Sequence, residues 1–255
     1  MELWSSAHAK TLIPTTLIML LIAVILRLTI GKKDMRIRMI PFQILSGLLF
    51  LIEIGKQVYS YTHGYDLYHL PFHFCSLFIF MLPLMAFYRG KHEGAVRAIT
   101  SAITTSMFLL LMIYPCLIYS ADNIKNFFTG YLDFHTVAFH NIVVFQFLLI
   151  IALQLHEPQP KGEIKTILLF TTGFCVISAT MAQLLETNFA NYYQCNIPPL
   201  EQLRLSIQGS LGYWPTQLLY ITIVSALTLA FVYGSYWFYR LVRNLTTKKF
   251  LSSAA

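Results

Sequence analysis

Seven stretches of this chain are apolar and long enough to cross a lipid bilayer, and this feature limits the folds open to it. A helix needs roughly 20 residues to span a hydrocarbon core about 30 Å thick. The composition agrees, because 56% of the residues are hydrophobic and only 11% are charged, which is unlike a soluble domain. The predicted spans are about 11–30, 39–62, 71–88, 98–119, 134–155, 165–187 and 213–239.

The apolar stretches predict helices and exclude a transmembrane barrel. Strands of such a barrel alternate apolar and polar residues, whereas residues 17–24 are apolar all round and residues 145–153 are so except for Gln146. The first stretch lacks the positively charged segment before it and the cleavage site after it that are typical of a signal peptide. We therefore predict that it is a membrane span. The expected fold is an all-α integral membrane protein, a seven-helix bundle forming a single domain over residues 1–255.

Lysines and arginines are unevenly shared between the two ends of the predicted bundle. Because basic loops stay cytoplasmic, the richer side is predicted to be inside. The poorer side has Lys10, Lys125 and Arg204, so the N-terminus is predicted outside and the C-terminus inside. This topology explains the net charge of +7 without a nucleic-acid partner. The 13 basic residues of the inner side lie in 31–38, 89–97, 156–165 and the tail after 239.

Polar side chains within apolar spans are the first candidates for function, because ionisable groups in hydrocarbon are costly unless they face a protein interior or a wet cavity. Glu53, Lys56 and Gln57 are three and four residues apart, so they share one helix face. The predicted topology puts all six such residues in the outer half of the bilayer. The six are Glu53, Lys56, Gln57, His73, Cys75 and His140.

A polar pocket that opens toward the outer leaflet follows from this placement. Gln183 and Gln217 reach a comparable depth on the sixth and seventh predicted helices. The alternative is that these groups only hydrogen-bond neighbouring helices, as buried polar residues in membrane bundles often do. Glu53 and Lys56 are three residues apart on the helix, so they can satisfy each other as an ion pair without any ligand.

Cys75 and His140 suggest acyl transfer, which needs a thiolate nucleophile and a nearby base. Cys75 lies near the start of the third predicted helix, where the helix dipole favours the anion. His140 can take and return the proton, whereas His73 is two residues from Cys75 and points to nearly the opposite side of a helix. Lys56, Gln57 and Asn141 are the candidates for stabilising the tetrahedral oxyanion.

The remaining cysteines and histidines indicate no other chemistry. Four cysteines without CxxC spacing and eight histidines without an HExxH pattern predict no metal site and no cofactor. Cys175 is expected to be a small residue that only packs against neighbouring helices. Cys116 and Cys195 either form a disulfide or stay free. A GxSxG elbow is also absent.

A short amphipathic segment is predicted in the longest connection. Apolar residues recur there at helical spacing after Pro198 and Pro199, which is typical of a helix lying at the membrane interface. They are Leu200, Leu203, Ile207 and Leu211.

The stretch around Cys75 resembles a known family. Residues 70–77, LPFHFCSL, resemble the LPLHLCS motif of bacterial YwaF-type membrane proteins, relatives of the eukaryotic transmembrane protein 164. His140 falls where that family has a histidine, and Asn191 begins a stretch similar to its NY…PP…LGxWP region. The resemblance covers about residues 40–235. Phe72 and Phe74 replace the usual leucines, which should change only the shape of the pocket.

This resemblance implies a seven-helix protein, similar also to the androgen-induced family of membrane hydrolases, in which a Cys–His pair transfers fatty acyl groups on phospholipids. By that analogy Cys75 is the nucleophile, His140 is its base, and Asn191 joins the pocket residues. The implied partners are a phospholipid or lysophospholipid and the bilayer itself. The implied location is a cell membrane, the bacterial plasma membrane.

Two other functions stay open at this point. In a small-solute transporter, Glu53, Lys56 and His140 would be proton or substrate contacts. Against this function, the predicted helices of this chain lack the paired Gly- or Pro-interrupted segments of repeat-built transporters, although Pro83 and Pro115 can break the third and fourth. In a non-catalytic membrane protein, the same polar residues would only hold helices together. The sequence does not fix the lipid, the acyl acceptor or the oligomeric state.

Overall fold

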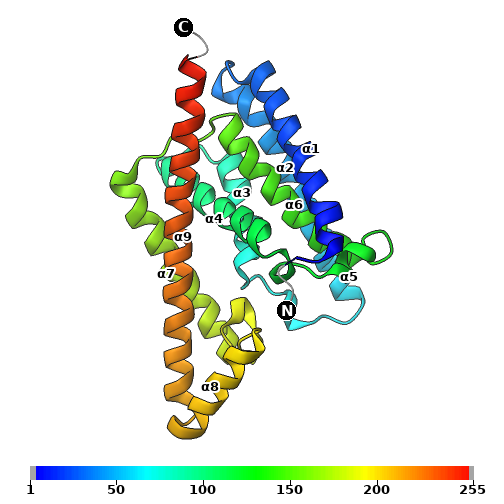
Figure 1. Ribbon diagram of the computed structural model, residues 1–255, viewed down its shortest axis with the longest axis vertical. Coiled ribbons are helices and arrows are strands. Elements are labelled where there is room, and N and C mark those ends of the chain that lie inside the picture. Colours follow the sequence, from blue (N-terminus) through cyan, green and yellow to red (C-terminus); the bar gives the residue numbers. More distant parts are fainter. Residues whose placement is uncertain (1–3, 253–255) are drawn as a thin grey trace.

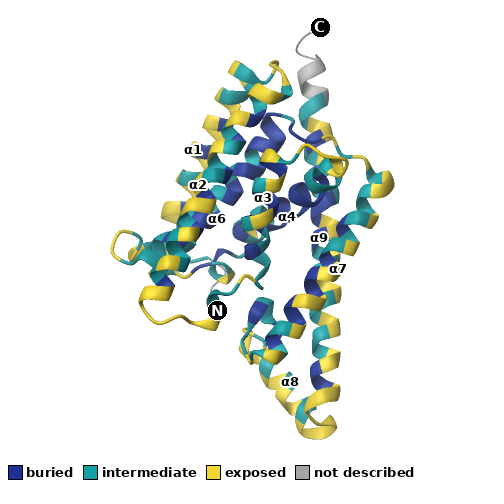
Figure 2. Ribbon diagram, turned by 180° about the vertical axis from the view of Figure 1, so that it is seen from behind, coloured by how far each residue is buried: buried dark blue, intermediate teal, exposed yellow. Residues whose placement is uncertain are grey.

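Helix α4 (Glu93–Ile113) is the centre of the molecule. Residues 98–107 are buried without interruption, which requires neighbours on every side of the helix (Figure 2). Many of them are small or carry a hydroxyl group, so adjacent backbones can approach closely. The hydroxyls of Thr100, Thr104, Thr105 and Ser106 donate to carbonyls of the same helix, that of Thr104 to Thr100 at 2.7 Å.

The structure is a computed structural model that describes residues 4–252, with side chains up to residue 247. All of the regular secondary structure in this part is helical. Besides α4, the helices are α1 (Ser6–Ile30), α2 (Met35–Thr62), α3 (Leu77–Phe87), α5 (Ala121–Lys125), α6 (Tyr131–Ala152), α7 (Pro160–Leu184), α8 (Pro198–Leu211) and α9 (Tyr213–Ser252).

The helices form two groups on either side of α3 and α4 (Figure 1). On one flank α6 packs against both α1 and α2. On the other flank α7 and α9 run together, and α8 packs against α9. Helix α4 contacts α6, α7 and α9, so it joins the two flanks. Near α8 the two groups diverge, and this is where the candidate site lies.

Six helices are long and apolar enough to cross a membrane, namely α1, α2, α4, α6, α7 and α9, the last over Tyr213–Thr247. The prediction of an all-α, multi-pass membrane protein is therefore confirmed. The predicted span 71–88 differs, because its apolar helix covers only Phe74–Phe87 and is shorter than the roughly 20 residues of a full crossing. The seventh crossing and the orientation stay predictions.

The shortening of the third span has a local cause. The segment 63–73 is mostly irregular and includes a 3-10 turn at Leu67–His69, so the helix starts later than its hydropathy suggests. A second 3-10 turn, Phe74–Ser76, precedes α3. His73 is therefore not helical, whereas Cys75 does lie close to the start of a helix, as predicted.

Three arginines hold the C-terminal end of α6. Arg27 donates to the carbonyl of Ala152 at 3.0 Å, and Arg38 to that of Leu153 at 2.8 Å. Arg97 donates to the carbonyl of Leu155 at 3.0 Å. The last carbonyls of a helix lack partners within it and carry partial negative charge, so guanidinium groups satisfy both needs. Arg38 and Arg97, two of the basic residues counted on the predicted inner side, thus also join α2 and α4 to the end of α6, and Arg27 of the first predicted span joins α1 to it. The side chains of Lys248 and Lys249, which the topology prediction counted, lie outside the described residues.

Replacing Arg38 with methionine should destabilise the protein by about 1.5–3 kcal/mol, the usual worth of a hydrogen bond to a charged group. Thermal unfolding in detergent checks this. The matched control is Arg36→Met, because Arg36 is exposed and its side chain has no hydrogen bond among the described residues. Equal melting temperatures for the two variants would contradict a capping role for Arg38.

Candidate functional site

A cavity of about 770 Å³ lies between the two helix groups. This volume is within the range of small-molecule sites. One wall comes from α2, α6 and the segment around Cys75, and the opposite wall from α8 and α9. Its ionisable lining includes Glu53, Lys56, Cys75, His135, His140 and Arg204.

The opposite wall is largely apolar. Leu200, Leu203 and Ile207 of α8 line the cavity, and so do leucine and isoleucine residues of α9. Helix α8 was predicted at the membrane interface. Three of its four predicted apolar positions line the cavity, and Leu211 is not among the lining residues. The position at the interface stays a prediction. Most of the ionisable groups of the cavity therefore lie on one wall, and the wall of α8 and α9 is largely apolar except for residues such as Arg204 and Tyr220.

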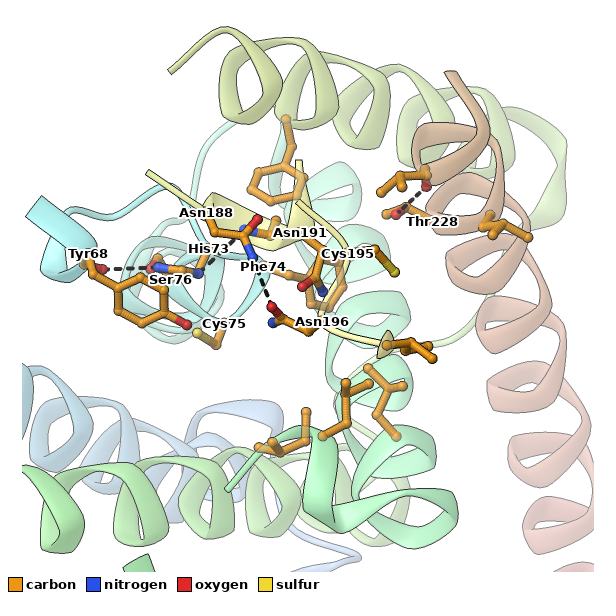
Figure 3. Close-up of a pocket in the computed structure, with 18 of the residues that line it drawn as sticks. Tyr68, His73, Phe74, Cys75, Ser76, Asn188, Asn191, Cys195, Asn196 and Thr228 are labelled. Atoms are coloured by element: carbon orange, nitrogen blue, oxygen red, sulfur yellow. Dashed lines mark hydrogen bonds between the residues drawn. The ribbon is translucent and has the colours of Figure 1, made fainter. Parts of the chain in front are cut away.

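Cys75 and His140 line this one cavity, although they come from different segments of the chain. Figure 3 shows Cys75 with Tyr68 and Asn196 on the cavity wall. Within the described residues, no hydrogen bond joins Cys75 Sγ to His140. The Nδ1 atom of His140 donates to the carbonyl of Thr136 at 2.6 Å. Its Nε2 therefore keeps a lone pair and can accept a proton.

His73 is bound at both ring nitrogens. Its Nε2 donates to the carbonyl of Tyr68 at 3.0 Å, and its Nδ1 accepts from the backbone N–H of Ala190 at 3.4 Å (Figure 3). Burial lowers the pKa of His73, which favours the neutral ring that this arrangement requires. His73 thus ties the Cys75 segment to the segment before α8. It has no free nitrogen to act as a base.

The polar face of α2 forms a buried network around the carboxylate of Glu53. Lys56 Nζ lies 2.7 Å from Oε1, and Gln57 Nε2 donates to the same oxygen at 2.8 Å. The third partner is His135 of α6, whose Nε2 lies 2.9 Å from Oε2. The ion pair of Glu53 and Lys56 was expected from their spacing. The sequence analysis did not predict a role for His135, because this residue lies at the edge of the predicted fifth span and its local sequence does not indicate a partner.

Gln57 and Asn141 do not line the cavity. The amide of Gln57 also donates to the carbonyl of His69 at 3.1 Å, so its hydrogen-bonding capacity is used on its own flank. Asn141 donates to the carbonyl of Val137 at 2.8 Å, one turn back on α6. Of the three residues suggested as oxyanion donors, only Lys56 lines the cavity.

Gln183 and Gln217 hold a loop in place. Both donate to the carbonyl of Tyr192 at 3.0 Å, one from α7 and the other from α9. Neither lines the cavity, and this arrangement matches the alternative in which they only bond to neighbouring segments. Asn191 does line the cavity, and its carbonyl accepts from the hydroxyl of Tyr220 at 2.6 Å.

Comparison with known proteins identifies the family of this chain. The model of the TMEM164 family matches residues 3–236, nearly the whole length. The chain belongs to the TMEM164 family. Neither a search of curated proteins nor a search of solved structures gave a match. The matched range includes all of the residues that line the cavity.

The other cysteines of this TMEM164-family chain are free thiols, so of the two alternatives for Cys116 and Cys195 the structure has the unpaired one. Cys116 Sγ lies 3.7 Å from Nδ1 of the buried His8. It is the one hydrogen-bonded cysteine–histidine pair in the described part of the chain, and it is not among the residues that line the cavity. Cys195 lines the cavity, and Cys175 is buried. Within residues 4–247, no cluster of three or more metal-ligating side chains occurs.

Arg204 joins α8 to α9 at the cavity wall of this TMEM164-family protein. Its guanidinium contacts the carboxylate of Glu201 at 2.5 and 2.8 Å and the side-chain oxygen of Gln217 at 3.0 Å. The hydrogen bond from Arg204 lowers the pKa of Glu201, and the same pair raises the pKa of Arg204. Both cations of the cavity, Lys56 and Arg204, are therefore already paired with a carboxylate.

Proposed function

We propose that this membrane protein transfers or hydrolyses fatty acyl groups of phospholipids through a thioester on Cys75, with His140 as general base and then general acid. The observation that supports this most directly is that Cys75 and His140 line one cavity whose opposite wall is largely apolar. A phospholipid can place its ester against the polar wall and an acyl chain along α8 and α9. Membership of the TMEM164 family fits a function within the membrane.

The reaction has two steps. In the first, Nε2 of His140 takes the thiol proton and Cys75 Sγ attacks the ester carbonyl carbon. The tetrahedral intermediate collapses, the carbon–oxygen bond breaks, and the leaving alcohol receives the proton from His140. In the second, water or the hydroxyl of a lysolipid attacks the thioester, and the thiol is restored. Because no hydrogen bond joins the two side chains, the first proton transfer needs a bridging water or a shift of either side chain on substrate binding.

The charge that develops on the carbonyl oxygen needs a donor. Lys56 is the candidate that lines the cavity, and its ammonium group keeps two N–H bonds beyond the one aimed at Glu53. The distribution of lysine and arginine between the loops predicts that this end of the bundle is outside, so we place the proposed reaction on the outer side of the membrane.

Trapping the thioester tests the proposal. Purified protein in phospholipid vesicles with a labelled acyl chain is quenched with acid and tested for label that neutral hydroxylamine removes. We expect such label on the wild type and on Cys116→Ala, and none on Cys75→Ala. Cys116 is the matched control, because it is also a partly exposed cysteine and has a histidine partner outside the cavity lining. Label that persists in Cys75→Ala would show that Cys75 is not the nucleophile.

A further inference from the structure

His135 has one bound and one unbound ring nitrogen at the cavity. Glu53 is a hydrogen-bond acceptor paired with Lys56, so the Nε2 of His135 that faces Glu53 at 2.9 Å carries the proton. In the neutral ring Nδ1 is then an acceptor, and it has no hydrogen-bond partner among the described residues. His135 lines the cavity and is 7% exposed.

His140 has the same arrangement with its nitrogens exchanged, since its Nδ1 is bound and its Nε2 is unbound. The two histidines are five residues apart on α6, about 7.5 Å along the helix axis. Both line the same cavity. The site therefore offers two imidazole bases, and each is held by a hydrogen bond through its other ring nitrogen.

Acyl transfer through a thioester also needs two deprotonations. The thiol must lose its proton before it attacks the lipid ester, and the acceptor hydroxyl must lose one when it attacks the thioester. One histidine can serve both steps only if it reaches both positions. A carboxylate that fixes the tautomer of an imidazole and stabilises its protonated form makes that imidazole a better base.

We infer that the Glu53–His135 pair is the second base of this site, acting on the acyl acceptor while His140 serves Cys75. In this step His135 Nδ1 takes the proton from the acceptor hydroxyl, and the acceptor oxygen bonds to the thioester carbon. The carbon–sulfur bond breaks, Cys75 leaves as a thiolate, and the proton on His135 returns to it. Glu53 is a positioning residue, held by Lys56 and Gln57. This inference rests on the proposed function.

His135→Gln tests whether His135 acts on the acyl acceptor while His140 acts on the thiol. The glutamine amide can still donate to Glu53, whereas the free acceptor nitrogen is lost. We expect the thioester to form at a rate close to that of the wild type. Its transfer to water or lysolipid should fall about 10²- to 10⁴-fold, the usual worth of a general base. Labelled acyl-enzyme should therefore accumulate. The matched control is His63→Gln, since His63 is exposed and its ring contacts only Tyr59 and Thr62 of its own helix end.

The outcomes separate this inference from the function on which it rests. Unchanged turnover in His135→Gln, or equal losses of labelling and turnover at an unchanged melting temperature, would overturn the role of His135 and leave Cys75 as the nucleophile. A wild type that never carries label would instead overturn the proposed function. If His135→Gln does not fold, Glu53→Gln keeps an acceptor oxygen for His135 and removes the negative charge. It should show a smaller loss in the same second step, and a loss confined to thioester formation would contradict the inference.

Discussion

Replacing Cys75 with alanine is expected to reduce acyl transfer to the level of protein-free vesicles, and replacing His140 with alanine to lower it about 10²- to 10⁴-fold. The first change removes the atom that bonds to the acyl group. The second removes the unbound Nε2 that takes the thiol proton, while the attack itself stays possible through the small thiolate fraction. Initial rates of transfer between labelled phospholipid and lysophospholipid measure both effects.

The step that fails distinguishes the two histidines. His140→Ala should form the thioester label as slowly as it turns over, because no base takes the thiol proton and only the small thiolate fraction attacks, whereas His135→Gln should keep the label. Cys116→Ala is expected to retain both, since Cys116 is not among the cavity-lining residues. If turnover depended on Cys116 and survived without Cys75, the nucleophile would be the thiol paired with His8.

Replacing Glu53 with alanine should have the largest effect on stability, about 3–5 kcal/mol, because it leaves a mostly buried lysine without its partner. Glu53 is 5% exposed, and the side chain of Lys56 is 14% exposed. Without Glu53 the ammonium group of Lys56 has no carboxylate partner among the described residues, and a charge within a helix bundle is costly when it is unpaired. Thermal unfolding in detergent, followed by tryptophan fluorescence, measures the loss.

The double variant Glu53→Ala, Lys56→Ala supplies the control for this cost. Removing both charges also removes the unpaired ion, so a large part of the lost stability should return. Its acyl transfer should stay low, because His135 still lacks its carboxylate. Equal melting temperatures of the single and double variants would show that Lys56 finds another partner and that the ion pair is not what Glu53 contributes.

Features that depend on neighbours along the chain were predictable. Hydropathy alone indicated an all-α membrane protein, and six of the predicted spans correspond to helices long enough to cross. The spacing of Glu53 and Lys56 predicted their contact, and the motif around Cys75 indicated the family to which the chain belongs. The third span was overestimated, since hydropathy does not register that residues 71–73 are not helical.

What the sequence determined by itself is which segments avoid water and which polar groups they carry, because hydropathy and helical spacing belong to residues that are close in the chain. Only the tertiary structure decided where each polar group finds its partner. It joined His135 to Glu53 across two helices, used Gln183 and Gln217 to hold a loop, and made α8 a wall of the cavity. The physical reason is that a buried polar group must bond to whatever lies nearest in space, and helix packing sets that neighbour.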